Sequence, residues 1–519
     1  MHLILLHGYL LQGTGSNIYV ANIAKAWQGQ GHAVTVVCQD YGAKSLTFVD
    51  HYIGPGEKIP SDPPEPGSLR VIVPAINRLL PVYVFDHYEG FRVKTIPEMT
   101  VDECETHIEM TAAVLRSVVA QGCSHVLANH VLFGPIIASR ALTDTPIPYD
   151  VKIHGSALEY TLVPNPEWML YAVEGLKGAR HIFVGTRYVK HRTLEVFASY
   201  RNQLALEDKL HIVPPGMDPE IFKLSESYES GMDRFLENVG NMIQENGNGR
   251  QAFQIALPYD GDDRSHHELL LRAGERYNQR AVDADLPAKW PRIESHEPII
   301  LYFGKFLPAK GVGEVLVTVP TVLSKIPSVR FVFVGFGSYR EHLEGMLQGM
   351  IHGDSDMFKA CARAGDFVEV KHLDHWFRPL TSQEGDRITM TGILDHETLG
   401  SILPLASLTI VPSKWPEAFG MVAVEAMAAG VLPLCNDHAG LRDVIEAVGA
   451  DSPEIADLMR LDRAEFVTQL PEKINSALNF LYPDGYAEQT HRKMVSRQLR
   501  RISVKHFSWD RIANMLIDL

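Results

Sequence analysis

The chain alternates short apolar runs with segments whose apolar residues recur at helical spacing, and this alternation constrains the fold more than any other feature. The first run, HLILLHGY, precedes a segment in which Ile18, Ile23 and Trp27 fall on one helical face. The β-branched run HAVTVVCQD then completes a strand–helix–strand unit. Further strand-like runs follow: HVLANHVLFG, YDVKIHGS, HIFVGTRYV and LHIVPPGMD. Such repetition predicts a parallel sheet covered by helices on both faces.

A second series of the same kind begins with EPIILYFGKF and continues with VRFVFVGFGS, RITMTGILD, LTIVPSKW and VLPLCN. The length of 519 residues also favours more than one domain. We therefore predict an α/β protein with two Rossmann-like, doubly wound domains, residues 1–218 and 297–504. The polar, acidic residues 219–296 are interpreted as an insertion or linker. The amphipathic helix expected at 505–519 is predicted to dock on the protein.

Charge and cysteine content exclude several classes of partner. The formal net charge is −15 and no long run of Lys and Arg occurs, so we expect no nucleic-acid partner and no association with a membrane. The five cysteines have neither metal-ligand nor redox spacing, which suits a reducing cytoplasm. The sequence contains no stretch of 18 apolar residues, so we expect no transmembrane helix. These features indicate a cytoplasmic location.

The segment PEAFGMVAVEAMAAG, residues 416–430, places two carboxylates around a glycine turn and an apolar helix. It follows a strand-like run, and ligands of open α/β sheets bind outside such strand ends. The amides of Phe419, Gly420, Met421 and Val422 would form an anion site at the helix N-terminus. Carboxylates at Glu417 and Glu425 would accept hydrogen bonds from hydroxyl groups. A nucleotide sugar has hydroxyls at both ends and phosphates between them. On these fifteen residues alone, a packed helix with one solvated glutamate is the slightly favoured interpretation.

Two further loops follow strands of the second series. Lys305 and Lys310 flank the turn in FGKFLPAKG, where two cations could hold a pyrophosphate and stabilise it as it leaves. In TGILDHETL, the backbone groups of Ile393 and Leu394 could read the edge of a base. By themselves such lysines are more often surface residues.

The first domain offers weaker signals. Gly15 in LQGTGSNIY could let the backbone approach a donor phosphate, but the loop lacks a full G-x-G-x-x-G pattern. His154 follows the strand-like run YDVKI and could donate a hydrogen bond to a sugar hydroxyl. His130 has the same position after a strand-like run and is the weaker candidate. The acidic run DGDDRSHHE has no specific ligand spacing, so we predict no metal site.

These motifs, in this order, resemble retaining glycosyltransferases of the GT-B fold, family 4. The resemblance is carried by GHAVTVV, the HG at 154–155, VPPGMDPEIF, GKFLPAKG, TGILDHETL, VPSKWPEAFGMVAVEAMAAGVLPL and FSWDRIA. It implies two Rossmann-like domains facing across a cleft. The second domain would bind the donor and the first the acceptor, with the last helix crossing back to the first domain.

The resemblance also implies roles for individual residues. Glu425 would bind the ribose of the donor. The catalytic group would comprise Glu417 beside the donor sugar, Lys305 and Lys310 on the diphosphate, and His154 near the sugar. The first basic position is usually arginine in the family, so Lys305 replaces a bidentate grip with a point charge.

The implied reaction is a front-face transfer of a hexosyl group with retention of configuration. It needs no metal and no cofactor, only a nucleotide-sugar co-substrate. A UDP-sugar is the favoured donor, with GDP- and ADP-sugars left open, and the acceptor would be a sugar or another small hydroxyl compound. A sugar phosphorylase, a nucleotide-sugar 2-epimerase and a non-catalytic GT-B scaffold remain alternatives. The oligomeric state, the insertion at 219–296 and the long stretch at 340–387 are left without a predicted role.

Overall fold

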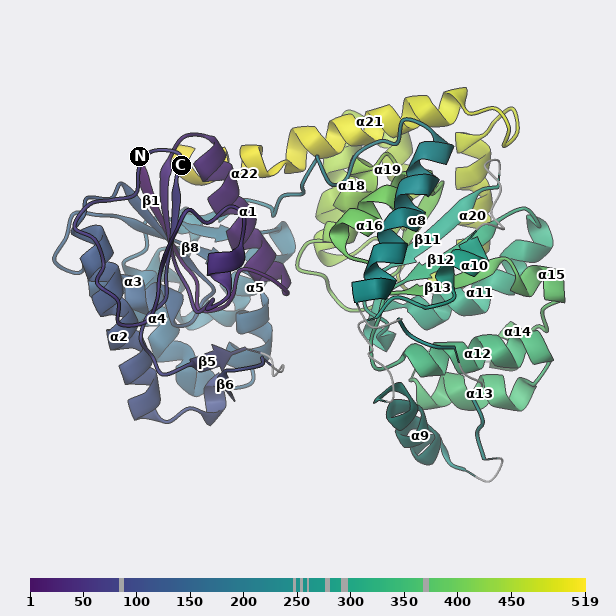
Figure 1. The fold of residues 1–519 in the computed structure, drawn as a ribbon, viewed down its shortest axis with the longest axis horizontal. Coiled ribbons are helices and arrows are strands. Elements are labelled where there is room, and N and C mark those ends of the chain that lie inside the picture. Colours follow the sequence, from purple (N-terminus) through teal and green to yellow (C-terminus); the bar gives the residue numbers. More distant parts are fainter. Residues whose placement is uncertain are drawn as a thin grey trace. The chain divides into compact units, whose positions relative to one another are not determined.

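The computed structural model describes residues 1–83, 88–245, 249–252, 255–258, 261–275, 281–290, 297–366 and 373–519. The chain forms two compact units (Figure 1). Unit 1 consists of Met1–Gly216 and Phe507–Leu519, and unit 2 of Met217–His506. Each unit contains a parallel sheet with helices on its faces, so the predicted α/β architecture with two Rossmann-like units is confirmed.

The main sheet of unit 1 has the order β10-β9-β8-β7-β1-β2-β4-β3, and its strands pair in parallel. The strands β5 and β6 form a separate parallel pair. The central strands are buried on both faces, as expected of a covered parallel sheet. The strand bounds are β1 His2–Leu6, β2 Ala33–Val37, β3 His51–Ile53, β4 Leu69–Ile72, β5 Leu79–Val82, β6 Arg92–Thr95, β7 His125–Asn129, β8 Tyr149–Ile153, β9 Ile182–Val184 and β10 Leu210–Ile212.

Helices cover the sheet of unit 1. The longer ones are α1 Gly15–Gly29, α2 Val101–Val119, α3 Gly134–Leu142, α4 Met169–Lys177, α5 Arg187–Val196 and α22 Trp509–Asp518. Short turns are η1 Ala43–Ser45, η2 Ile96–Glu98, η3 Leu158–Leu162, η4 Pro166–Trp168, η5 Ala198–Tyr200, α6 Arg201–Leu204 and α7 Leu206–Lys209.

The C-terminal helix α22 belongs to unit 1 and packs on α1. The indole N–H of the fully buried Trp27 donates a hydrogen bond to the Ala513 carbonyl at 3.1 Å. Trp509 lies so close to Gly216 that a Cβ there would stand 2.5 Å from the indole ring. The last helix is therefore part of the core of unit 1.

The sheet of unit 2 has the order β13-β12-β11-β14-β15-β16, again with parallel pairing. Its strands are β11 Ile299–Phe303, β12 Arg330–Val334, β13 Ile388–Gly392, β14 Leu408–Val411, β15 Leu432–Asn436 and β16 Arg460–Leu461. Its helices and turns before β14 are α8 Tyr228–Glu245, α9 Asp263–Glu275, α10 Leu286–Lys289, η7 Pro308–Lys310, α11 Val312–Lys325, α12 Arg340–His352, α13 Ser355–Ala364, α14 Leu373–Trp376, α15 Ser382–Gly385, α16 His396–Ile402 and η8 Leu403–Leu405. After β14 come α17 Met421–Ala428, α18 Ala439–Asp451, α19 Pro453–Met459, α20 Phe466–Leu481 and α21 Thr490–Phe507.

The described residues of 219–296 pack against the body of unit 2. Helix α8 lies on α16, and its buried face includes Phe235, Val239 and Met242. The Phe235 ring lies 4.6 Å from the fully buried Trp290 ring. Further along, Val282 forms an antiparallel bridge with Gly392 at the end of β13. This segment thus shares apolar contacts and backbone pairing with the second sheet.

The helices α12 and α13 of the 340–387 stretch form a closely packed pair. A Cβ at Gly345 would stand 2.3 Å from the Cys361 sulfur, and one at Gly349 would stand 2.8 Å from the Phe358 amide nitrogen.

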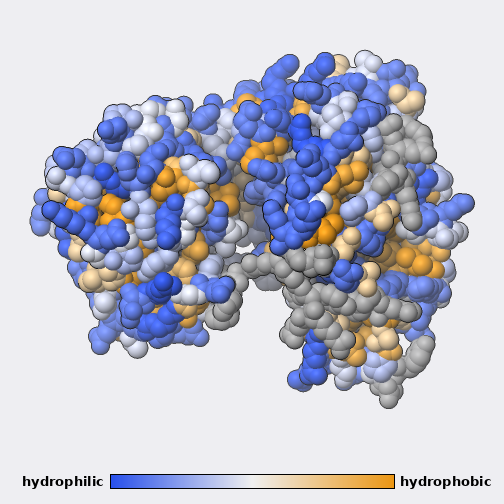
Figure 2. All heavy atoms as spheres, in the orientation of Figure 1, coloured by the Kyte–Doolittle hydropathy of each residue, from blue (hydrophilic) through white to orange (hydrophobic). Residues whose placement is uncertain are grey.

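All five cysteines are buried and free. The face drawn in Figure 2 is mostly hydrophilic with small, scattered apolar areas. Within the described residues, no helix combines the length and apolar character needed to cross a bilayer.

Candidate functional site

Two strand-end loops of unit 2 meet beside each other and position the residues predicted for the donor site. The amide of Lys414, in the loop after β14, donates to the Ala309 carbonyl in the loop after β11 at 2.9 Å. Gly311 has φ +71°, and a Cβ at this position would stand 2.3 Å from the Pro412 carbonyl oxygen. Only glycine satisfies both the left-handed backbone and the close contact. The two loops are therefore held together by their backbones.

This contact brings Lys310 and Glu417 together. The Lys310 ammonium donates a hydrogen bond to Glu417 Oε1 and forms an ion pair with it. The Ser413 hydroxyl donates to the same oxygen at 2.5 Å. Both charged side chains keep partial solvent access, with 36% of the Lys310 side chain and 24% of the Glu417 side chain exposed. They could therefore contact a ligand without leaving their positions.

Helix α17 begins directly after this pair, as the sequence predicts. Gly420 has φ +128° and its carbonyl accepts from the amides of Ala423 and Val424. The first-turn amides of Met421 and Val422 have no carbonyl within the helix to bond. Phe419 and Gly420 are buried, and a Cβ at Gly440 would stand 2.5 Å from Phe419 Cα. The turn before the helix is thus fixed by close packing.

Glu425 lies on α17 and is 9% exposed. Burial raises the pKa of this carboxyl to about 7. Within the described part of the chain, no hydrogen bond or ion pair satisfies its side-chain oxygens. A buried acid in this state favours a hydroxyl-bearing ligand, because such a ligand would supply the missing hydrogen-bond donors.

The other predicted donor-site residues are placed less favourably. The Lys305 side chain is exposed, and its carbonyl accepts from the Tyr302 hydroxyl at 3.0 Å. The Ile393 amide already donates to the Ala281 carbonyl at 3.2 Å, so that N–H cannot read a base edge. Leu394 is buried. The structure therefore brings Lys310 and Glu417 into contact and leaves Lys305 in no recorded contact with either of them.

Four polar groups of this region were absent from the sequence prediction. Ser413 is one of the two donors to Glu417. Lys414 donates to Glu314 Oε1 at 2.5 Å, and the Glu314 side chain is 1% exposed. His438 Nε2 lies 2.7 Å from the Ser413 carbonyl, and burial lowers its pKa. A glutamate within the apolar run GVGEVL was the available signal for Glu314, since such a residue needs a buried cationic partner.

In unit 1, the predicted residue His154 lies in a group of aromatic rings. Its Nε2 is 2.8 Å from Asn129 Oδ1, and because an amide oxygen only accepts, Nε2 carries the proton. The ring packs edge-on against Tyr19 at 5.0 Å and lies 4.8 Å from His130. Burial holds the pKa of His154 well below its usual range. The imidazole is therefore neutral, and its Nδ1 is a hydrogen-bond acceptor.

Gly15 opens α1 and is exposed, and a Cβ there would meet no atom within 4 Å. The fold itself does not require glycine at this position. The acidic run predicted to bind no metal lies mostly on α9, with Asp260 outside the described residues. Its members contact separate partners: Asp263 pairs with Arg363, and His267 Nδ1 lies 2.9 Å from His342 Nε2.

Comparison with known protein families matches one segment of unit 2. Residues 380–450 match the family model Glycosyl transferases group 1, and this segment includes Ile393, Glu417 and Glu425. A curated relative, spore coat protein SA of Bacillus subtilis, is 24% identical over 221 residues, which is 43% of this chain. The aligned part spans 48% of that relative, about half its length.

Solved structures share the fold over the whole chain. A glycosyltransferase from Rickettsia africae superposes with a TM-score of 0.54 at 14% identity, covering 100% of this chain and 97% of the other. The catalytic domain of starch synthase IV from Arabidopsis thaliana, solved with ADP and acarbose, gives 0.52 at 14% identity and covers 100% and 98% of the two chains. The chain thus has a GT-B type of fold, and its residues 380–450 are similar to the Glycosyl transferases group 1 family.

Proposed function

We propose that this protein is a glycosyltransferase that moves a sugar from a nucleotide-sugar donor to an acceptor hydroxyl, with retention and without a metal ion. The observation that carries the proposal is the contact between Lys310 and Glu417 directly before the first turn of α17. The hydroxyl acceptor and the helix-terminal amides lie within residues 380–450, which match the group 1 family, and the Lys310 cation contacts this segment from the loop after β11. The fold neighbour solved with ADP supports a nucleotide ligand.

The donor would lie along this region. The amides of Met421 and Val422 and the Lys310 ammonium would bind the diphosphate, with Lys305 as a second, solvent-exposed cation. Glu417 would accept from hydroxyls of the donor sugar. Glu425 would accept from the ribose hydroxyls, which relieves the cost of its burial. A UDP-sugar is the proposed donor, with GDP- and ADP-sugars as the alternatives.

The reaction would proceed on one face of the sugar. Lys310 and the amides would stabilise charge on the diphosphate as the glycosidic bond breaks. The incoming hydroxyl would lose its proton to a diphosphate oxygen. His154 would contact the sugar through a neutral ring, because burial disfavours its charged form. It would therefore act as a hydrogen-bonding group.

The stereochemistry of the product tests this proposal. The full chain is incubated with UDP-glucose, GDP-glucose and ADP-glucose in turn and with a panel of sugar acceptors, and released nucleoside diphosphate is measured. Proton NMR then gives the anomeric configuration of the product. Retention is expected: an α-linked donor should give an α-glycoside. An inverted product would require a base opposite the leaving group and would overturn the front-face reaction. Absence of nucleoside diphosphate release with all three donors would overturn the transferase assignment.

A further inference from the structure

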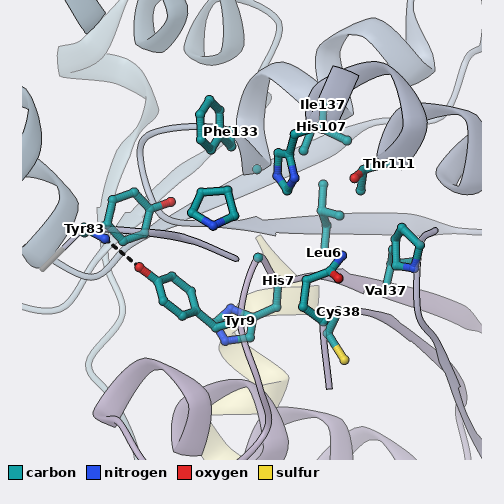
Figure 3. Close-up of a pocket in the computed structure, with 15 residues that line it drawn as sticks. Leu6, His7, Tyr9, Val37, Cys38, Tyr83, His107, Thr111, Phe133 and Ile137 are labelled. Atoms are coloured by element: carbon teal, nitrogen blue, oxygen red, sulfur yellow. Dashed lines mark hydrogen bonds between the residues drawn. The ribbon is translucent and has the colours of Figure 1, made fainter. Parts of the chain in front are cut away.

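Unit 1 contains a cavity at the carboxyl ends of β1 and β2, beneath α2 and α3 (Figure 3). Its walls are formed in part by Leu6, Val37, Phe133 and Ile137, which are apolar and buried. The space open to the centre of a water molecule is about 20 Å³. One bound water needs roughly 10–15 Å³ by this measure, so the cavity has room for one or two hydroxyl-sized groups and not for a whole ring.

Four polar side chains lining this cavity have hydrogen-bonding atoms without a partner. They are His7 Nδ1, His107 Nδ1, Thr111 Oγ1 and Gln39 Oε1, and none of these atoms has a hydrogen-bond partner among the described residues. The four residues are 1%, 3%, 4% and 2% exposed. His107 and Thr111 lie one turn apart on α2 and are drawn on the same side of the cavity in Figure 3. Buried polar groups are nearly always bonded, so their orientation toward one cavity points to a ligand.

The lining carries no charge to attract an ion. The described residues around the cavity include neither a lysine or arginine nor an aspartate or glutamate. Burial lowers the pKa of His107 and of His7 to about 4, so both rings are neutral at pH 7. His7 Nε2 is occupied by Asn17 Oδ1 at 3.0 Å, and the Tyr83 hydroxyl donates to the Leu132 carbonyl at 2.9 Å. An anion placed here would lose its hydration without gaining a cation.

We propose that this cavity binds an uncharged hydroxyl or hydroxymethyl group of a sugar or polyol, held by Thr111, His107 and Gln39. The Thr111 hydroxyl both donates and accepts, and the Gln39 oxygen accepts, which matches the dual character of an alcohol. The apolar walls would contact the carbon atoms that carry it. That this ligand is the acceptor of sugar transfer rests on the function proposed above; the binding site itself does not.

Saturation-transfer NMR with glucose and glycerol tests the site on the full chain. Thr111→Val keeps the volume and removes the hydroxyl, and we expect it to weaken glucose binding about tenfold. Its melting temperature should equal or exceed that of the wild type, because a buried hydroxyl without a partner is removed. Thr106→Val, an exposed threonine on the same helix, is the matched control and should change neither property. Glycerol should compete with glucose, and inorganic phosphate should not.

Several results would overturn the proposal. They are the absence of a saturation-transfer signal from glucose in the wild type, an equal signal in Thr111→Val, competition by phosphate, or a clear fall in the melting temperature of Thr111→Val. UDP binding is measured on the same samples as a separate readout. If UDP and UDP-glucose fail to bind while the glucose signal still depends on Thr111, the cavity stands and the proposed transferase function fails. If donor transfer occurs and the signal does not depend on Thr111, the function stands and the cavity proposal fails.

Discussion

Lys310 and Glu417 are 107 residues apart in the chain and share a direct hydrogen bond in unit 2. The bond joins the loop after β11 to the loop after β14, and Ser413 completes it from the second loop. Because both side chains remain partly exposed, the pair is available to a ligand as well as to the fold. A partly exposed pair of this kind contributes little to stability, so its removal should report mainly on function.

Replacing Lys310 by alanine should lower kcat more than it raises the donor KM. The diphosphate gains charge as the glycosidic bond breaks, so the lysine contributes more in the transition state than in the ground state. Steady-state kinetics measure both constants, with the donor from which the wild type releases nucleoside diphosphate. Lys325→Ala, which removes an exposed ion pair with Glu472, is the control and should leave both unchanged. An effect of Lys310→Ala on KM alone would show that the lysine binds the ground state and the transition state equally.

Lys305→Arg should hold or raise kcat, because a bidentate contact with the diphosphate replaces a point charge.

Glu425→Ala should weaken nucleotide binding and leave the fold intact. The ribose hydroxyls would lose a carboxyl acceptor, and hydrogen bonds to its ionised form, which prevails above pH 7, are worth roughly 1.5–3 kcal/mol. Isothermal titration with UDP, GDP and ADP measures the loss. Unchanged affinity for the nucleotide that binds the wild type would remove Glu425 from the proposed site.

The same residue should make stability depend on pH. The pKa of Glu425 is raised from its ordinary value of 4.5 to about 7 in the folded protein. Between these values the folded state holds a proton that the unfolded state has lost, so the free energy of unfolding falls as pH rises from about 4.5 to about 7. Glu425→Gln should therefore stabilise the protein by up to about 3 kcal/mol at pH 8, with no gain below pH 4.5.

Urea unfolding at several pH values measures this gain. Glu237→Gln, an exposed glutamate in the same unit, provides the control and should show no such trend. A gain that is constant across pH would mean that the Glu425 carboxyl is not held in its protonated form.

Lys152 should produce the opposite trend in unit 1. Burial lowers the pKa of this lysine from 10.5 to about 7, and its ammonium donates to the Val213 carbonyl. Between pH 7 and 10.5 the unfolded state binds the additional proton, so stability rises with pH in this window. The free energy of unfolding of Lys152→Met relative to wild type should fall by about 4 kcal/mol between pH 6 and pH 10. Lys177→Met, an exposed lysine, should show no pH trend in the same titration.

Gly311→Ala should destabilise unit 2 and reduce transfer together. Its φ of +71° costs a side chain about 1–2 kcal/mol, and the Pro412 carbonyl leaves no room for a Cβ. Gly353 has almost the same φ, +70°, with no atom within 4 Å of an added Cβ, so Gly353→Ala isolates the backbone term. Chemical denaturation should show Gly311→Ala to be less stable than Gly353→Ala by roughly 2 kcal/mol. Equal losses would mean that the two loops separate easily.

Much of the fold follows from local patterns, because the strands of a covered parallel sheet are continuous apolar runs. Each strand-like run named from the sequence corresponds to an observed strand. The strands β3 to β6 and β16 were not predicted. Of these, β3 and β6 are short and partly exposed, β5 contains Pro81, and β16 has two residues. In α8, the spacing of Phe235, Val239 and Met242 is a helical signal that the acidic composition around it obscured.

The candidate site was less predictable, because its contacts join distant parts of the chain. The local motif indicated Glu417 and the start of α17, and the structure adds the contact with Lys310. No local pattern could show that the Ala281 carbonyl occupies the Ile393 amide, since that bond depends on the path of a segment 112 residues away. The unpartnered atoms of His107 and Thr111 likewise emerge only when α2 packs over the sheet.

The division of unit 1 between two stretches of sequence has a consequence for biosynthesis. Residues 1–216 are made first, but the helix that covers Trp27 comes from residues 507–519, so all of unit 2 is synthesised before unit 1 can close its core. Domains generally fold as they leave the ribosome, from the N-terminus onward. Here part of the apolar surface of unit 1, including Trp27, stays uncovered while unit 2 is synthesised, and chaperones have access to it during that time.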